Sequence, residues 1–111
     1  MEDSREYEKG FDNDLYLKAI ETFGTTNQTI VAIEKLSELQ KELTQTLRGN
    51  VNQEHIIEKI ADVEIMLDQL KMMFVINELD LHRTKNKKQD KLRLKIQAKV
   101  RPKMWRAIHP V

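Results

Sequence analysis

The chain has 111 residues and a mass of 13.1 kDa, which is the size of one domain. With 40% hydrophobic and 33% charged residues but only three Gly and two Pro, the composition excludes collagen-like, low-complexity and wholly disordered proteins. The absence of cysteine excludes disulfide scaffolds, cysteine-ligated zinc and thiol catalysis. No apolar run approaches the roughly 20 residues that cross a membrane, and the acidic first residues do not resemble a signal peptide. We therefore expect a soluble, cytoplasmic protein with no membrane partner.

The net charge of +1 conceals two oppositely charged segments. Residues 1–80 contain 8 Lys and Arg against 17 Asp and Glu, a balance of −9. Residues 81–111 contain 11 Lys and Arg against a single acid, Asp90, a balance of +10. This division fits a basic arm for polyanions, or an acidic cation site beside a basic phosphate-binding segment. Composition alone does not decide between the two.

A first helix is predicted over residues 13–23, after a flexible polar leader at 1–11. The low Gly and Pro content and the many Leu, Glu, Lys, Gln and Ile residues favour helix here and throughout the chain. Asp12 or Asn13 is a suitable N-cap, and Gly24 suits the C-terminal stop.

A second helix is predicted from a cap at Thr25 or Thr26 to about residue 48, where Gly49 closes it. Its apolar residues recur every three or four positions, which predicts one buried stripe. This stripe consists of Ile33, Leu36, Leu39, Leu43 and Leu47.

A third helix is predicted over about 53–76, with Asn52 as its cap. One apolar stripe consists of Ile56, Ile60, Val63, Leu67, Leu70 and Phe74. Further apolar residues cover much of the remaining surface, namely Ile57, Ile65, Met66, Met72, Met73, Val75 and Ile76. A helix that is apolar nearly all round is normally buried nearly all round, which so short a chain cannot achieve alone. We therefore expect a partner subunit.

A fourth, strongly basic helix is predicted over about 84–100, ending before Pro102. A basic tail follows at 101–111. No internal repeat and no strand-like alternation is present. The predicted fold class is an all-α, four-helix-type bundle whose helical domain spans residues 12–100.

Two ladders of acidic residues occupy the second and third predicted helices. They consist of Glu34, Glu38 and Glu42 in the second, and Glu54, Glu58 and Asp62 in the third. Residues four apart share a helix face, so like charges repel by a few tenths of a kcal/mol per pair unless a cation lies between them. Carboxylates that converge between antiparallel helices would suit Mg²⁺. The alternative is that both ladders are solvated surfaces, as most charged residues are.

The same region resembles the MazG-like nucleoside triphosphate pyrophosphohydrolases, in particular the short versions encoded by bacteriophages and prophages. The resemblance rests on AIETFGTTNQTIVAIEKLSELQKEL (Ala19–Leu43), LRGN, IIEKIADVEIMLDQLKMMF (Ile56–Phe74) and KLRL from Lys91. It implies a MazG-like helical bundle that forms homodimers or homotetramers. It also implies hydrolysis of a nucleoside or deoxynucleoside triphosphate to monophosphate and pyrophosphate, with Mg²⁺ or Mn²⁺. A phage-encoded protein would act in the host cytoplasm.

The chain departs from the family pattern at two metal-ligand positions. The family reads E-E-x-x-E on the second helix and E-E-x-x-D on the third, with the ligands three residues apart. The corresponding positions here are 35 with 38, and 59 with 62. Glu38 and Asp62 are retained, but Lys35 and Lys59 replace the other two acids.

The resemblance assigns the remaining roles as follows. Glu38 and Asp62 would be the catalytic metal ligands, and Glu34 and Glu58 would assist them as further metal ligands. Glu34 and Glu58 stand one residue from the family positions, which is about 100° around a helix. Lys91 and Arg93 match the family's basic segment and would hold the phosphates. A solvated basic surface is the alternative for these two residues.

The two lysines change the chemistry expected of the site. Two carboxylates and two ammonium groups need no divalent cation, because the lysines supply the counter-charge internally. Such a site would repel Mg²⁺, and a hydrolase that lacks two of four ligands should lose most of its rate. If instead the ligands are shifted by one residue, the pairs Glu34 with Glu38 and Glu58 with Asp62 would still bind metal.

Three functions therefore compete. The first is a Mg²⁺-dependent pyrophosphohydrolase whose activity Lys35 and Lys59 impair. The second is a catalytically silent relative that binds nucleotides or a protein partner. The third is a nucleic-acid-binding protein that uses residues 83–106, for which steep salt dependence would be expected. The third ranks last, because the basic helix has neither interleaved aromatics nor a helix-turn-helix pattern, so nucleic acid is not an expected partner.

Overall fold

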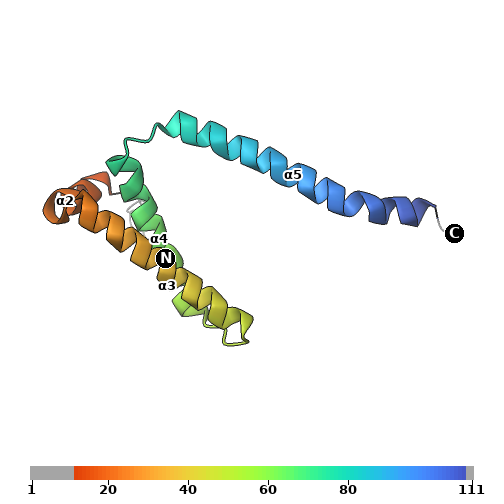
Figure 1. Cartoon of the computed structure of the whole chain (residues 1–111), viewed down its shortest axis with the longest axis horizontal. Helices are drawn as coiled ribbons and strands as arrows, with labels where there is room; N and C mark the ends of the chain where they lie inside the picture. The colour runs from red at the N-terminus through yellow and green to blue at the C-terminus, as the bar shows by residue number, and fades with distance from the viewer. Residues whose placement is uncertain (1–11, 110–111) are drawn as a thin grey trace, which may run out of the picture. The chain divides into compact units, whose positions relative to one another are not determined.

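The computed structural model describes residues 12–109; the predicted leader at 1–11 and the last two residues lie outside the described residues. Within this range the chain forms only helices (Figure 1). They are α2 (Asn13–Phe23), α3 (Thr25–Leu47), α4 (Gln53–Met73) and α5 (Glu78–Ile108). The all-α fold class is confirmed for this part of the chain. None of its helices is long and apolar enough to cross a membrane.

The chain divides into two compact units at Val75. The first unit contains α2, α3 and α4, which all contact one another, and the second contains α5. The charge boundary seen in the sequence lies close to this division, so an acidic three-helix unit is followed by a basic helix.

The caps of α2 and α4 form as predicted. The Asp12 carboxylate accepts a hydrogen bond from the Leu15 N–H at 3.0 Å, and the Asn52 side chain accepts one from the His55 N–H at 3.1 Å. Both satisfy backbone donors that the first turn of a helix leaves free.

The predicted threonine cap of α3 is wrong. The cap position belongs to Gly24, whose φ is 86°, and no side-chain hydrogen bond caps the helix. The same glycine ends α2, because its N–H donates to the Ile20 carbonyl at 2.8 Å. A residue without a Cβ takes this left-handed conformation at little cost, so α3 begins at Thr25 immediately after α2 ends.

Helices α3 and α4 form an antiparallel hairpin with one register. Polar side chains meet across it in four rungs, which are Gln28 with Gln69, Lys35 with Asp62, Glu38 with Lys59, and Glu42 with His55. In each rung the two residue numbers add to 97, as they must when two antiparallel helices keep a constant register. Successive rungs are 7, 3 and 4 residues apart on α3, which is the heptad spacing of a helix–helix seam.

The core of the first unit is small. Its buried residues are Tyr16, Gln28, Ala32, Met66 and Gln69. The Gln28 side-chain N–H donates to the Gln69 carbonyl oxygen at 2.7 Å, so the two buried amides satisfy each other across the hairpin. A polar pair therefore occupies a place where the sequence analysis expected only apolar contacts.

Only part of the apolar stripes predicted for the second and third helices lies in the seam. The seam of α3 combines apolar Ala32 and Leu39 with the polar rung residues. Most of the predicted stripe residues, among them Leu36 and Ile60, remain exposed. The prediction failed because it counted only apolar residues, whereas four polar rungs occupy the contact line.

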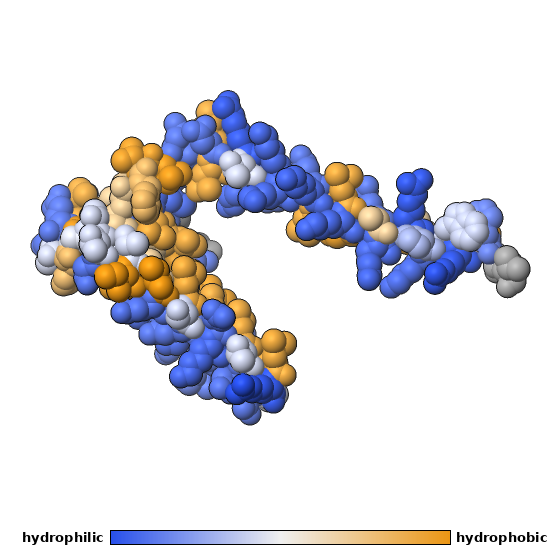
Figure 2. All heavy atoms as spheres, viewed as in Figure 1, coloured by the Kyte–Doolittle hydropathy of each residue, from blue (hydrophilic) through white to orange (hydrophobic). Residues whose placement is uncertain are grey.

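The exposed stripe residues define an apolar face of the hairpin. Together with Ile57, which was not in a predicted stripe, it consists of Ile33, Leu36, Leu43 and Leu47 of α3, Ile60 and Leu67 of α4, and Phe74 at the C-cap of α4. These side chains are 43% to 89% exposed. Most of these residues follow a seam position by one residue. The two helices run in opposite directions. Residues that follow a seam position by one therefore lie on the same side of the hairpin in both helices. Figure 2 shows orange, hydrophobic areas beside blue, hydrophilic ones on the hairpin.

The opposite side of the hairpin is a polar face. It carries Glu34, Glu38 and Lys41 of α3 and His55, Glu58 and Asp62 of α4, most of which precede a seam position by one residue. An open groove on this face is lined by residues from both helices, including Glu38, His55 and Lys59.

The fourth helix is longer than predicted at both ends. Asn77 caps α5 by accepting hydrogen bonds from the Leu79 and Asp80 N–H groups at 2.8 and 3.3 Å, so the helix starts at Glu78 rather than near residue 84. It continues to Ile108 instead of ending before Pro102. Proline removes one backbone donor and disfavours helix in the residue before it, but helix-forming residues on both sides continue the helix.

The buried amide pair provides a test of the hairpin. Replacing Gln69 by Leu leaves the Gln28 side-chain N–H buried without its acceptor, which we expect to lower the free energy of unfolding by about 1–3 kcal/mol. The double variant Gln28→Leu/Gln69→Leu should recover much of this loss, because no polar group is then stranded. Urea unfolding followed by circular dichroism measures both effects. A Gln69→Leu variant as stable as the native chain would contradict the pairing.

Candidate functional site

The candidate site lies in the middle of the α3–α4 hairpin. Lys35 and Glu38 stand one turn apart on α3, and Lys59 and Asp62 stand one turn apart on α4. The antiparallel register brings the two pairs to the same level of the seam. We call these four residues the ion-pair cluster.

The lysines of the ion-pair cluster bind the two retained carboxylates. Lys59 Nζ lies 3.3 Å from Glu38 Oε2, and Lys35 Nζ lies 3.6 Å from the same oxygen. Lys35 Nζ also lies 3.8 Å from Asp62 Oδ2. The internal counter-charge expected from the sequence is thus present in the structure. The four side chains are only 27% to 42% exposed, so they are screened less than freely solvated ions.

Glu38 has a pKa below its ordinary value of 4.5. The main cause is the hydrogen bond that Lys59 donates to its carboxylate, and the positive charges of Lys35 and Lys59 act in the same direction. Partial desolvation opposes them but is weaker than the hydrogen bond. Glu38 is therefore held in its ionised form by Lys35 and Lys59.

The residues of the ion-pair cluster do not fit Mg²⁺. Magnesium is bound by oxygen ligands in octahedral geometry, usually by carboxylates whose negative charge it neutralises. Here two ammonium groups already neutralise two carboxylates, and both contact the oxygen of Glu38 that would be a ligand. Among residues 12–109, no group of three or more His, Asp or Glu side chains converges to hold a metal ion.

The other predicted metal ligands, Glu34 and Glu58, lie on the polar face outside the ion-pair cluster. Both are exposed, and neither belongs to an ion pair among the described residues. The acidic residues of one ladder do not all lie on the same surface. The Glu42 side chain is only 14% exposed and lies in the seam, where its Oε1 is 3.6 Å from His55 Nδ1. The six carboxylates therefore do not act as one acidic surface.

The predicted phosphate-binding residues belong to the second unit. Lys91 is exposed on α5, and Arg93 is held one turn from Asp90, with Nη1 2.6 Å from Oδ1.

Sequence reasoning missed the rungs at both ends of the hairpin, Gln28 with Gln69 and Glu42 with His55. A signal was present in the sequence, because Gln28, Lys35 and Glu42 recur every seven residues. A heptad of polar residues within a helical hairpin indicates a polar seam.

Comparisons with known proteins do not supply a family for this chain. No protein-family model, no curated protein and no solved structure matches it. The chemistry of the site is therefore argued from its own residues.

The pKa of Glu38 tests the ion-pair cluster. In a Lys59→Met variant it should rise toward 4.5, because its main hydrogen bond and one nearby charge are lost. Nuclear magnetic resonance titration of the carboxyl carbon measures this pKa directly. Because folding lowers the pKa, the native chain should gain stability from Glu38 above about pH 4.5 and lose it as the pH falls through the folded-state value.

The matched control is Lys41→Met, which removes the same charge from the same face without touching an ion pair of Glu38. It should leave the pKa of Glu38 nearly unchanged. Equal shifts in the two variants would mean that general surface charge, rather than the ion-pair cluster, sets this pKa.

Proposed function

We propose that this chain is a MazG-like helical module that has exchanged nucleotide hydrolysis for a binding role, with a second copy of itself as its partner. The observation that carries the proposal is the ion-pair cluster, in which Lys35 and Lys59 lie 3.3 to 3.8 Å from the carboxylates of Glu38 and Asp62. The MazG-like resemblance of the two helices supplies the rest of the argument.

The loss of hydrolysis follows from the charge of the ion-pair cluster. In a metal-dependent pyrophosphohydrolase the ion polarises the phosphate and activates water, so catalysis depends on carboxylates that attract a divalent cation. The two carboxylates and two ammonium groups here add to zero charge. A divalent cation would have to displace both lysines from Glu38 and would then face their repulsion.

A second candidate function is Mg²⁺-dependent hydrolysis by carboxylates four residues apart. One observation favours it, because Glu34, Glu38, Glu58 and Asp62 all lie on the polar face, with Glu34 and Glu58 outside any described ion pair. Lys35 and Lys59 would then be neighbours of the metal site rather than its replacement.

The apolar face supports self-association. It presents eight large apolar side chains on one side of the hairpin. Single exposed apolar residues are normal on a protein surface, but a contiguous apolar face indicates an interaction site. Full burial of one such side chain contributes about 1.5–3 kcal/mol. A face of this kind can pair with its own copy around a two-fold axis, which is the commonest arrangement of homo-oligomers.

Pyrophosphate release from a panel of deoxynucleoside triphosphates, with Mg²⁺ or Mn²⁺, separates the two candidates. We expect no turnover by the native chain and measurable turnover by the Lys35→Glu/Lys59→Glu variant, which restores four carboxylates. A matched control is Lys41→Glu/Lys71→Glu, which changes the charge equally elsewhere in the first unit and should stay inactive.

Turnover by the native chain that is abolished by Asp62→Asn would overturn the proposal in favour of hydrolysis. If neither the native chain nor the double variant turns over while both stay folded by circular dichroism, the MazG-like assignment itself would lose its support.

Sedimentation equilibrium tests self-association. The native chain should form a homodimer or homotetramer, and Leu36→Gln/Ile60→Gln should weaken it at least about tenfold, since two contacts of the apolar face are lost. The control Leu15→Gln/Ile65→Gln changes exposed apolar residues outside that face and should leave the assembly intact. A monomeric native chain would refute this part of the proposal.

A further inference from the structure

We infer that α5 binds the phosphate backbone of double-stranded nucleic acid through one line of cations. These cations, here called the cation stripe, are Lys88, Lys91, Lys95, Lys99 and Arg106. All five side chains are exposed. The inference goes beyond the proposed function and does not depend on it, because it concerns only the second unit.

The helix aligns the cation stripe along its axis. Lys88 and Arg106 are 18 residues apart, which is about five complete turns, so they point in nearly the same direction. Successive residues of a helix are about 100° apart around its axis. On this basis all five cations of the stripe point into one arc of roughly 80°. At about 1.5 Å per residue the stripe is about 27 Å long. Its alignment requires α5 to continue beyond Pro102, as it does.

The positive charge of the cation stripe is not neutralised within α5. The only acidic residue after Asp80 is Asp90, which lies about 160° around the helix from the ends of the stripe. Asp90 is bound by Arg93 at 2.6 Å, and no residue of the stripe forms an ion pair among the described residues. Five cations therefore face solvent in one row with no carboxylate among them.

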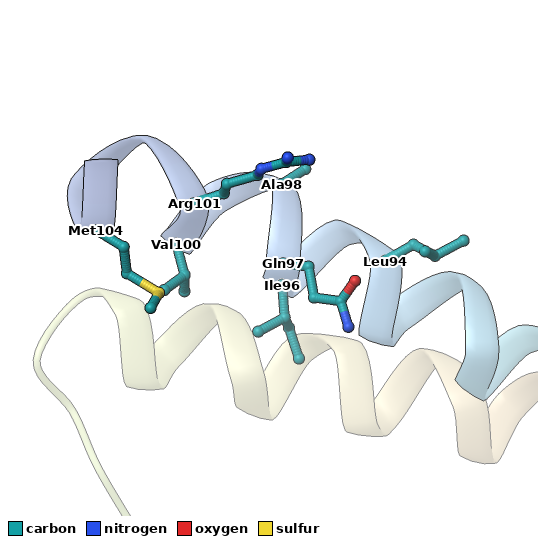
Figure 3. A pocket seen from close by; sticks show the side chains of 7 residues that line it. All are labelled: Leu94, Ile96, Gln97, Ala98, Val100, Arg101 and Met104. Atoms are coloured by element: carbon teal, nitrogen blue, oxygen red, sulfur yellow. The ribbon is translucent and has the colours of Figure 1, made fainter. Parts of the chain in front are cut away.

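Apolar side chains occupy the other side of the same helix. The depression in Figure 3 is lined only by α5, and Ile96, Val100 and Met104 project from the helix to one side there. On the helical wheel the lining residues fall outside the arc of the cation stripe. Gln97 and Arg101 also line this depression, so the side of α5 away from the cation stripe mixes apolar with polar residues.

The scattered apolar residues of α5 favour nucleic acid over a lipid surface. A helix that lies on an anionic membrane combines a basic side with a continuous apolar side that it inserts. In α5 the apolar residues are interrupted by Arg93, Gln97 and Arg101. Contacts with phosphates need only a row of cations at the surface. A duplex carries about one negative charge per 1.7 Å of its axis, so a stripe of this length meets more phosphates than it has cations.

From the sequence, nucleic acid ranks last because the basic helix has neither interleaved aromatic residues nor a helix-turn-helix pattern. Those features serve base stacking and base reading, which specify sequence. Phosphate contacts position a protein on nucleic acid without reading sequence. We therefore expect binding that does not discriminate between sequences.

The experiment measures binding of the full chain to a fluorescent double-stranded DNA oligonucleotide of mixed sequence by anisotropy. Five phosphate contacts predict a slope of about −4.5 in a plot of log K against log salt concentration, which is 0.9 times five. Affinity should thus fall about 500-fold between about 50 and 200 mM salt.

Two triple variants with equal loss of charge locate the interface. Lys91→Gln/Lys95→Gln/Lys99→Gln removes three members of the cation stripe and should reduce the slope to about −1.8. Lys87→Gln/Arg93→Gln/Arg101→Gln removes three cations from other sides of α5 and should keep the native slope. Circular dichroism must show equal helix content in both variants. Binding of the native chain and both variants to vesicles of phosphatidylcholine and phosphatidylglycerol tests the lipid alternative.

The inference that the cation stripe binds DNA would be overturned if the native chain does not bind DNA, or if the two variants lose binding equally. Binding to the anionic vesicles but not to DNA would also overturn it and would assign α5 to a lipid surface. None of these outcomes depends on hydrolysis or on self-association, so a failure here is distinguishable from a failure of the proposed function.

Discussion

The fixed register of the α3–α4 hairpin is the constraint on which the first unit depends. Four polar rungs meet across the seam, and one of them, Gln28 with Gln69, is buried, so a misplaced partner there would leave an amide without a hydrogen bond. A slip of one turn would strand buried amides and separate the ion pairs at once, whereas aliphatic contacts would tolerate it. The polar seam therefore gives the hairpin its specificity, in the way that polar residues fix register in coiled coils.

The same register decides the chemistry of the site. It brings Lys35 and Lys59 onto the carboxylate of Glu38, so this acid is paired inside the protein. It also places several large apolar residues of α3 and α4 on one side of the hairpin, which leaves an apolar face that α2 to α4 do not bury. A neutralised site and an unburied apolar face arise from one arrangement, and together they favour binding over hydrolysis.

The two units differ in how their charges are arranged. In the first unit, lysines pair with Glu38, Asp62 and Asp68 within the hairpin, so part of the negative charge is locally compensated. In α5 cations outnumber acids, and after the first turn the single acid, Asp90, is bound by Arg93. Compensated charge stabilises a fold, while uncompensated charge in a row is available to a polyanion. This difference is the reason that the further inference concerns α5 and not the acidic unit.

The sequence by itself determined the helices, because low Gly and Pro content, the caps at Asp12 and Asn52, and the glycine at position 24 act over a few residues. It also showed that Lys35 and Lys59 could neutralise Glu38 and Asp62, since equivalent positions on paired helices face each other. Only the tertiary structure decided which stripe forms the seam, because apolar residues cover several sides of α4 and periodicity cannot choose among them. The start of α5 was a local signal that the prediction missed, because Asn77 caps it as Asp12 and Asn52 cap α2 and α4. Its continuation through Pro102 to Ile108 went against the local rule that proline disfavours a helix interior.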